Sequence, residues 1–140
     1  MNIPSKKVLV VLLCICVALV IAVAGVIACA NRVMRQIETV HSSMPAIDLS
    51  TVPDGVYHGA FGSLPVYVSL EVTMKDHRIA GISIKNQICG KNYDARETVL
   101  RIVRSQAARV DAVAGATISS KCIMIAVYKA LYPAAHGSER

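Results

Sequence analysis

The sequence predicts an α+β domain, in which helices pack on one face of a small antiparallel sheet, preceded by one N-terminal transmembrane helix. Residues 64–74 and 79–84 alternate apolar and polar side chains, which is the period-two pattern of half-buried strands. Residues 94–108 and 117–132 carry the wider apolar stripe of helices that cover a core. A short run of strands followed by helices is typical of the α+β class.

The N-terminal segment contains no charged residue from Val8 to Ala30. At about 1.5 Å per helical residue, this run is long enough to cross a hydrocarbon core of roughly 30 Å. Lys6 and Lys7 supply the basic start that a retained anchor and a cleaved signal peptide both need. The run is longer than the apolar region of a typical signal peptide, which favours a retained anchor.

Two alternatives to a retained anchor stay open. Ala28-Cys29-Ala30 resembles a signal cleavage site, and Val26-Ile27-Ala28-Cys29 resembles a loose lipoprotein box in which Cys29 would be lipidated. All of these interpretations place residues 31–140 outside the cytoplasm. We therefore expect a cell-membrane protein with one span and an extracytoplasmic soluble domain. The expected parts are an anchor or signal segment (1–30), a linker (31–53), the domain (54–133) and a loose tail (134–140).

The first half of the domain is expected to form strands. Gly55, Gly59 and Gly62 predict a short opening strand with bulges or bends. The two alternating runs are joined by the polar break at residues 75–78, which predicts an antiparallel hairpin. His77 stands in that break where glycine would be the easier turn residue.

The second half is expected to form two helices. Asp94 can cap a helix that runs to about Ala108, with a stripe formed by Val99, Ile102, Val103 and Gln106. The last helix should start near Thr117 and end before Pro133. Its predicted buried face consists of Ile123, Ala126, Val127, Ala130 and Leu131.

Composition argues against several functions. The net charge of +6 is scattered, Trp is absent and Phe occurs once, so a nucleic-acid platform with stacking aromatics is not expected. The positive charge suits phosphates or anionic head groups better. The five cysteines and four histidines show no metal-ligand spacing. A disulfide between Cys89 and Cys122 is left open, because extracytoplasmic cysteines can pair.

The stretch Asp111-Ala-Val-Ala-Gly-Ala-Thr117 is the strongest functional signal. Thr117 offers a hydroxyl at a predicted helix N-terminus, where backbone N–H groups and the helix dipole stabilise a phosphate. Gly115 and Ala116 have little or no side chain, so a nucleotide can approach the backbone closely. Ser119 and Ser120 would hydrogen-bond the phosphate or cap N–H groups. The competing interpretation is that Thr117 merely caps a helix.

These residues resemble the attachment site of the FMN-binding domain family, whose pattern reads Asp-x-x-Ser/Thr-Gly-Ala-Thr. The likeness continues into Arg104-Ser-Gln-Ala-Ala-Arg-Val-Asp111 before the site and Ile118-Ser-Ser-Lys-Cys-Ile123 after it. It also includes the opening strand from Asp54 and the hairpin, and so covers roughly residues 54–131. Ala114 is a departure, since the family usually has Ser or Thr there.

The resemblance implies that Thr117 carries flavin mononucleotide (FMN) through a phosphoester bond, and that the domain is an electron carrier with no catalytic residue of its own. In the family a separate Mg-dependent flavin transferase makes this link from FAD and releases AMP. Asp111 would then cap the turn or meet the transferase and its metal ion. Related domains occur in sodium-pumping NADH:quinone and ferredoxin:NAD oxidoreductases, so redox partner proteins are expected. A non-covalent ligand-binding module and a flavin-free structural subunit of a membrane complex are the two rival functions.

Overall fold

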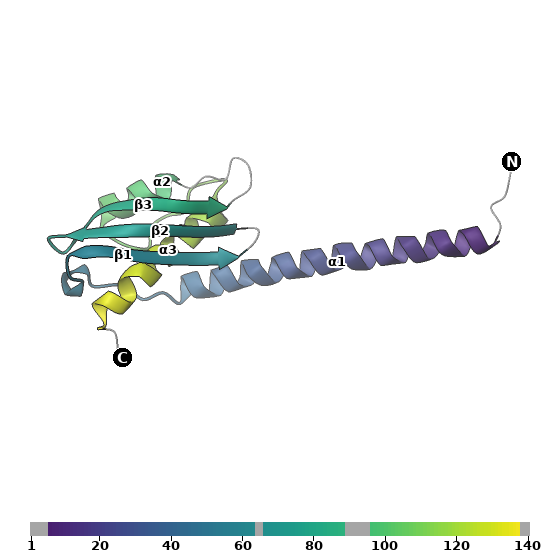
Figure 1. Ribbon diagram of the computed structural model, residues 1–140, viewed down its shortest axis with the longest axis horizontal. Coiled ribbons are helices and arrows are strands. Elements are labelled where there is room, and N and C mark those ends of the chain that lie inside the picture. The colour runs from purple at the N-terminus through teal and green to yellow at the C-terminus, as the bar shows by residue number, and fades with distance from the viewer. Residues whose placement is uncertain (1–5, 64–65, 89–95, 138–140) are drawn as a thin grey trace. The chain divides into compact units, whose positions relative to one another are not determined.

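A computed structural model describes residues 6–63, 66–88 and 96–137. The chain divides into two compact units, Met1–Arg35 and Gln36–Arg140. Figure 1 shows the elements in chain order, and their bounds are α1 (Lys6–Ser42), the 3-10 turn η1 (Leu49–Thr51), β1 (Gly55–Ser63), β2 (Val66–Lys75), β3 (Arg78–Ile88), α2 (Arg96–Ser105) and α3 (Thr117–Ala135).

Helix α1 contains the predicted apolar run and continues well beyond it to Ser42. It is the one helix among the described residues that is long and apolar enough to cross a membrane. Its large apolar side chains from Val8 to Ile27 are exposed, as expected of a surface that lipid would cover. The first residues of the expected linker, up to Ser42, are therefore helical.

The segment after the apolar run supplies part of the core of the second unit. Ile37 in the last turns of α1 is buried, and so are Met44 and Val52, which follow the helix. Between them, the Asp48 carboxylate accepts hydrogen bonds from the Ser50 backbone N–H (3.0 Å) and hydroxyl (2.6 Å) and thereby starts η1. Residues 36–53 therefore fold with the sheet and the two later helices.

The sheet has three antiparallel strands in the order β1-β2-β3 (Figure 1). The predicted hairpin is confirmed, because β2 pairs with β3 across the turn at residues 76–77. Asp76 and His77 both have positive φ, 52° and 56°. This left-handed pair is the backbone of a tight hairpin turn, and it is supported by Asp54, whose carboxylate accepts the N–H groups of both residues.

The glycines of β1 do not form the bulges that were expected from them. The pairing of β1 with β2 is continuous from Gly55↔Met74 to Ser63↔Val66. The register shifts lie instead between β2 and β3, at Ser69/Leu70 and Thr73/Met74. A different constraint acts at Gly59, where the backbone of α3 leaves no room for a side chain.

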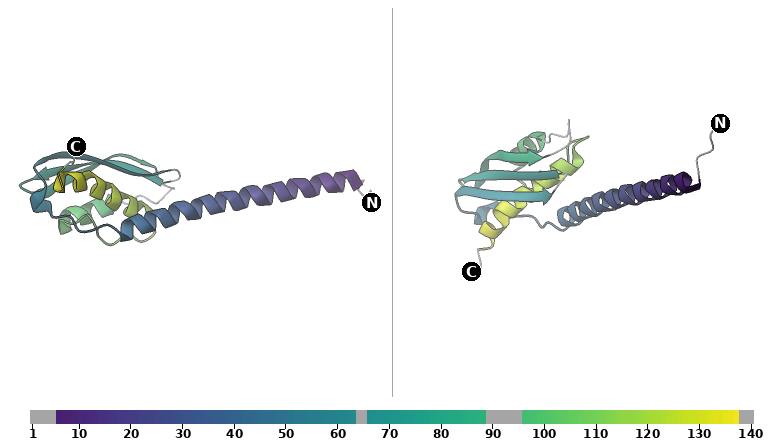
Figure 2. Two further views of the ribbon diagram at one scale, coloured as in Figure 1. Left: turned by 90° about the horizontal axis from the view of Figure 1, so that it is seen from below. Right: turned by 45° about the vertical axis from the view of Figure 1, so that its right-hand side comes forward.

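Helices α2 and α3 cover the same face of the sheet, as Figure 2 shows. The buried face of β2, formed by Val68, Leu70, Val72 and Met74, meets α3 there. All five residues predicted for the buried face of α3 are buried, together with Cys122, Met124 and Ile125. The predicted α+β class and the packing of helices on one face are therefore confirmed.

Both helices end at positions that differ from the expectation. Helix α2 stops at Ser105, because Gln106 has φ 53° and its side-chain amide pairs with the backbone N–H and carbonyl of Ile79 in β3. Helix α3 continues through Pro133 to Ala135. A proline in the last turn removes one hydrogen bond only, and the stacked rings of Tyr132 and His136, 4.1 Å apart, accompany the extra turn.

Two predictions fall on residues outside the described ranges. These are the capping role of Asp94 and the pairing of Cys89 with Cys122. Within the described part, Cys122 is fully buried in α3. Burial raises the pKa of its thiol to about 11.

Candidate cofactor-attachment site

The segment between α2 and α3 ends in a tight turn that presents Thr117. The Ala116 N–H donates to the Val113 carbonyl at 3.0 Å, so Ala114 and Gly115 are the two central residues of the turn. Gly115 has φ 78°, which L-residues rarely adopt, and the space where its Cβ would stand is open. We call residues 111–116 the attachment turn. Ala114 and Gly115 form the tip of this turn, and both are exposed.

Thr117 is the first residue of α3 and its side chain is exposed. The residue at the N-cap position is Ala116, which has no side-chain hydrogen bond to the helix. The first bond of the helix runs from the Ser120 N–H to the Ala116 carbonyl at 2.8 Å. The first-turn N–H groups have no partner inside the helix and carry the positive end of its dipole. Thr117 therefore does not cap this helix, and its hydroxyl lies beside a site suited to an anion.

The Ser120 hydroxyl forms hydrogen bonds to the backbone of the attachment turn. Its hydroxyl donates to the Ala116 carbonyl (2.9 Å) and accepts from the Val113 N–H (3.0 Å) and the Thr98 hydroxyl (3.0 Å). A hydroxyl has one donor and two acceptor positions, so this one is fully used within the protein. Of the two roles that the sequence allows for Ser120, the structure shows the bonding of backbone N–H groups.

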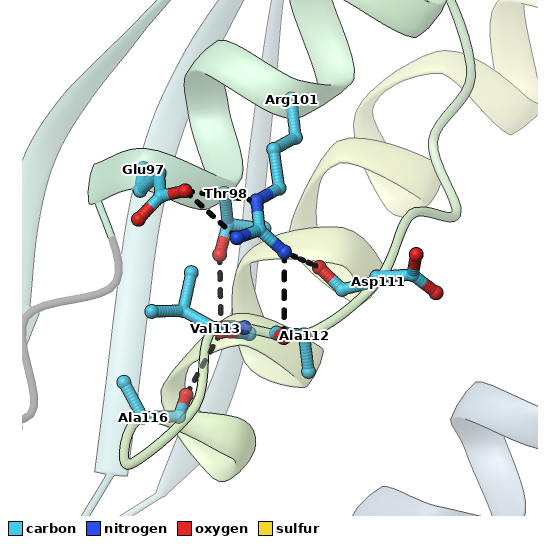
Figure 3. A network of polar contacts seen from close by, with 8 residues as sticks. Glu97, Thr98, Arg101, Asp111, Ala112, Val113 and Ala116 are labelled. Carbon is cyan, nitrogen blue, oxygen red and sulfur yellow. Dashed lines mark hydrogen bonds and ion pairs between the residues drawn. The ribbon is translucent and has the colours of Figure 1, made fainter.

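A second support comes from Arg101 on the surface of α2. Figure 3 shows its guanidinium between Glu97 and the attachment turn. Nε and Nη2 donate to Glu97 Oε1 at 3.1 and 2.7 Å, and Nη1 donates to the Asp111 carbonyl at 3.0 Å. A longer contact of 3.5 Å reaches the Ala112 carbonyl. Arg101 therefore bonds the backbone carbonyl of Asp111, and Asp111 is an exposed residue.

Sequence reasoning did not single out Thr98, Glu97 or Arg101 as site residues. The spacing of Glu97 and Arg101 does indicate a surface pair on a helix. This spacing does not indicate that the Arg101 guanidinium also bonds the attachment turn, ten residues further along the chain. The six predicted residues themselves lie together at the start of α3; Ala116, Ser119 and Ser120 are buried, whereas Asp111, Gly115 and Thr117 are exposed.

Positive charge gathers beside the attachment turn. A shallow hollow of about 870 Å³ is lined by Arg101, Arg104, Ser105, Arg109, Val110 and Asp111. On the first turns of α3, Lys121 forms an ion pair with Glu38. The arginines of the hollow favour an anionic ligand or partner at this end of the domain.

A second hollow of about 760 Å³ lies between β3 and α2, and Ile82, Ile84, Val99 and Leu100 contribute its apolar walls. Gln87 also lines it, and its Nε2 atom is buried without a hydrogen-bond partner among the described residues. A buried unpaired donor is rare in folded proteins and calls for an explanation. Lys85, Asn86, Arg96 and Glu97 also line this hollow. Its apolar part, together with the Gln87 amide, suits a flat heteroaromatic ring that has acceptor atoms on one edge.

Two features of this domain suit a phosphorylated cofactor. One is the exposed Thr117 at a helix N-terminus without a side-chain cap, and the other is the hollow between β3 and α2. The FMN-binding domain family matches residues 62–132, about half of the chain, and the chain belongs to this family. FMN is therefore the cofactor of this domain. No match was found among curated proteins or among solved structures.

Proposed function

We propose that this chain is a membrane-anchored, extracytoplasmic electron carrier in which FMN is joined to Thr117 by a phosphoester bond. The observation that carries the proposal is the position of Thr117, which is exposed on the first turn of α3. The backbone N–H groups of this turn have no acceptor inside the helix. The small residues before it leave its hydroxyl accessible to a large nucleotide. Membership of the FMN-binding domain family names the nucleotide.

The attachment reaction balances with FAD as the donor. The Thr117 oxygen forms a bond to the flavin-side phosphorus of FAD, and the bond from that phosphorus to the AMP-side oxygen breaks. AMP leaves, and the hydroxyl proton passes to a base of the transferase or to water. We propose a Mg-dependent flavin transferase as the partner that carries out this reaction, as the family resemblance implies.

In this proposal the helix N-terminus and the hollow between β3 and α2 would each bind one part of FMN. Backbone N–H groups of the first turn of α3 would hold the phosphate. The apolar walls between β3 and α2 would hold the ring, and the Gln87 amide would donate to one of its acceptor atoms. FMN, when bound, supplies one- and two-electron redox chemistry, and the protein tunes it through such contacts.

The proposed location rests on α1, which is long and apolar enough to cross a membrane. Anchored in this way, the domain would stay close to membrane redox proteins, which are its proposed electron donors and acceptors. The basic start at Lys6 and Lys7 supports an orientation with the N-terminus in the cytoplasm, although Arg32 and Arg35 partly offset it. Protease digestion of intact cells or spheroplasts would test this orientation.

Intact mass of the full chain tests covalent attachment. The chain is produced in a host with an active flavin transferase, extracted in detergent and compared with Thr117→Ala and Thr117→Ser. We expect the wild type to gain one FMN less water, Thr117→Ala to gain nothing, and Thr117→Ser to retain a hydroxyl acceptor. Because the Thr117 side chain is exposed, neither change should alter the melting temperature.

The rival functions give different results in the same experiment. An unmodified wild-type chain, with the transferase active on a control substrate, contradicts the covalent link. Flavin that copurifies but is lost in a denaturing gel then favours a non-covalent binding module. A colourless chain favours a structural subunit.

A further inference from the structure

We infer that helix α2 is a clamp that holds the attachment turn in the conformation required for FMN transfer. The clamp has two arms, Thr98 acting through Ser120 and Arg101 acting on the backbone of Asp111. This inference rests on the proposed function of Thr117. The clamp residues are positioning residues, because their bonds are to the turn and to one another and not to the reacting atoms.

The first arm is buried. Thr98 and Ser120 are 0% exposed, and their hydroxyls lie 3.0 Å apart between α2 and α3. Ser120 then bonds the Val113 N–H and the Ala116 carbonyl, on either side of Ala114 and Gly115. The Thr98 hydroxyl fills the remaining acceptor position, which orients the Ser120 oxygen toward the turn. A buried and fully satisfied network of this kind specifies one geometry.

The second arm is at the surface. Glu97 occupies Nε and Nη2 of Arg101, which directs Nη1 at the Asp111 carbonyl. An exposed ion pair of this kind contributes little to stability. Its effect is to orient a planar group whose donors have fixed directions, so that the start of the turn is held at a constant distance from α2.

The turn needs such support because side-chain packing hardly touches its tip. Ala114 and Gly115 are exposed, and no atom lies within 4 Å of the position of a Gly115 Cβ. Its conformation therefore depends on the hydrogen bonds from α2 and Ser120. Transfer requires the Thr117 oxygen to approach phosphorus in line, and a misplacement of about 1 Å can cost on the order of 100-fold in rate.

Attachment kinetics with purified transferase, FAD and Mg²⁺ test the surface arm. Arg101→Gln removes the bond to the turn, and Arg78→Gln removes the same charge from an exposed position at the start of β3. We expect Arg101→Gln to lower kcat about tenfold or more with little change in the KM for the chain. Arg78→Gln should leave kcat unchanged. Equal losses in the two variants, or a rise confined to KM, would show that Arg101 acts through charge in docking and would overturn the clamp.

Thr98→Val tests the buried arm, since it removes the hydroxyl and keeps the volume. We expect a lower kcat together with faster hydrogen exchange at the Val113 and Ala116 amides. Ser120→Ala removes both bonds to the turn and should raise the exchange rate of these amides above that of Thr98→Val. If Ser120→Ala does not fold, Thr98→Val alone still tests the inference. Unchanged exchange in the turn contradicts the inference.

The exchange measurement uses flavin-free protein. It therefore separates the clamp from the proposed function. A wild-type chain that accepts no FMN would refute the function, whereas faster exchange in Thr98→Val would still support the clamp.

Discussion

Gly59 of β1 lies directly against the backbone of α3 at Ala126. A Cβ at Gly59 would stand 2.0 Å from the Ala126 carbonyl oxygen and 2.9 Å from the Ala130 Cβ. The sheet and the helix that presents Thr117 can approach this closely because position 59 has no side chain. The contact sets how α3 seats on the sheet, and with it the position of the attachment turn.

Gly59→Ala should therefore destabilise the domain. The added methyl group collides with backbone, which cannot move aside as a flexible side chain would, so we expect a loss of about 1–3 kcal/mol or more in unfolding free energy. Gly81→Ala is the matched control, because its Cβ would meet no atom within 4 Å. Chemical unfolding of the full chain in detergent measures both. Equal stability of the two variants would contradict the close approach.

Ala114→Ser restores the hydroxyl that the family usually has at this position. We expect it to change the FMN attachment rate by less than about twofold, since exposed substitutions typically shift energies within roughly 0.5 kcal/mol. The physical reason is that Ser120 already bonds both ends of the turn, while Ala114 is exposed at its tip. A large gain in rate, measured by time-resolved intact mass, would show that the missing hydroxyl limits attachment.

Asp54 should make the hairpin sensitive to acid. Hydrogen bonds from the backbone N–H groups of Asp76 and His77 hold the pKa of the Asp54 carboxyl below its ordinary value. A carboxyl with a lowered folded-state pKa stabilises the fold above its unfolded pKa, and this contribution is lost as the pH falls below about 4. Melting temperatures from pH 7 to 3 should show wild type above Asp54→Asn at neutral pH and the gap closing in acid. A gap that stays constant with pH would exclude this role.

Cys122 should resist alkylation in the folded chain. With a pKa of about 11 it is ionised to about one part in a thousand at pH 8, and it has no exposed surface. In reducing buffer we expect N-ethylmaleimide to modify Cys122 only after unfolding in urea, as read from peptide masses. Labelling at equal rates in native and unfolded protein would be inconsistent with its burial. Omitting the reductant from the urea sample also tests the open question of a bond to Cys89.

Gln87 should report the position of the flavin ring. Gln87→Leu removes the amide donor and leaves the other residues of the hollow in place. We therefore expect a shifted flavin absorption spectrum and reduction potential with normal attachment to Thr117. Ser83→Ala, on the same strand but exposed and outside the hollow, is the control. An unchanged spectrum in fully flavinylated Gln87→Leu would mean that the ring lies elsewhere.

Much of the fold was predictable because it depends on periodic patterns of apolar residues that are local in the sequence. Alternation in β2 and the apolar stripe of α3 both persist over enough residues to identify the element and its buried face. The candidate acceptor Thr117 could be singled out for a similar reason, since a glycine turn, a threonine and a helix start lie within a few neighbouring positions. Errors occurred at element ends, where Gln106 bonds to Ile79 and where the helix tolerates Pro133.

The sequence by itself determined the class of fold, the apolar helix and the candidate acceptor Thr117, since each depends on residues close together in the chain. Only the tertiary structure decided which residues support that acceptor. Thr98 meets Ser120 across 22 positions, and Gly59 meets Ala126 across a still longer separation. Such pairs depend on how the helices pack on the sheet, and this packing is decided by the whole core. It produces no periodic pattern in the sequence.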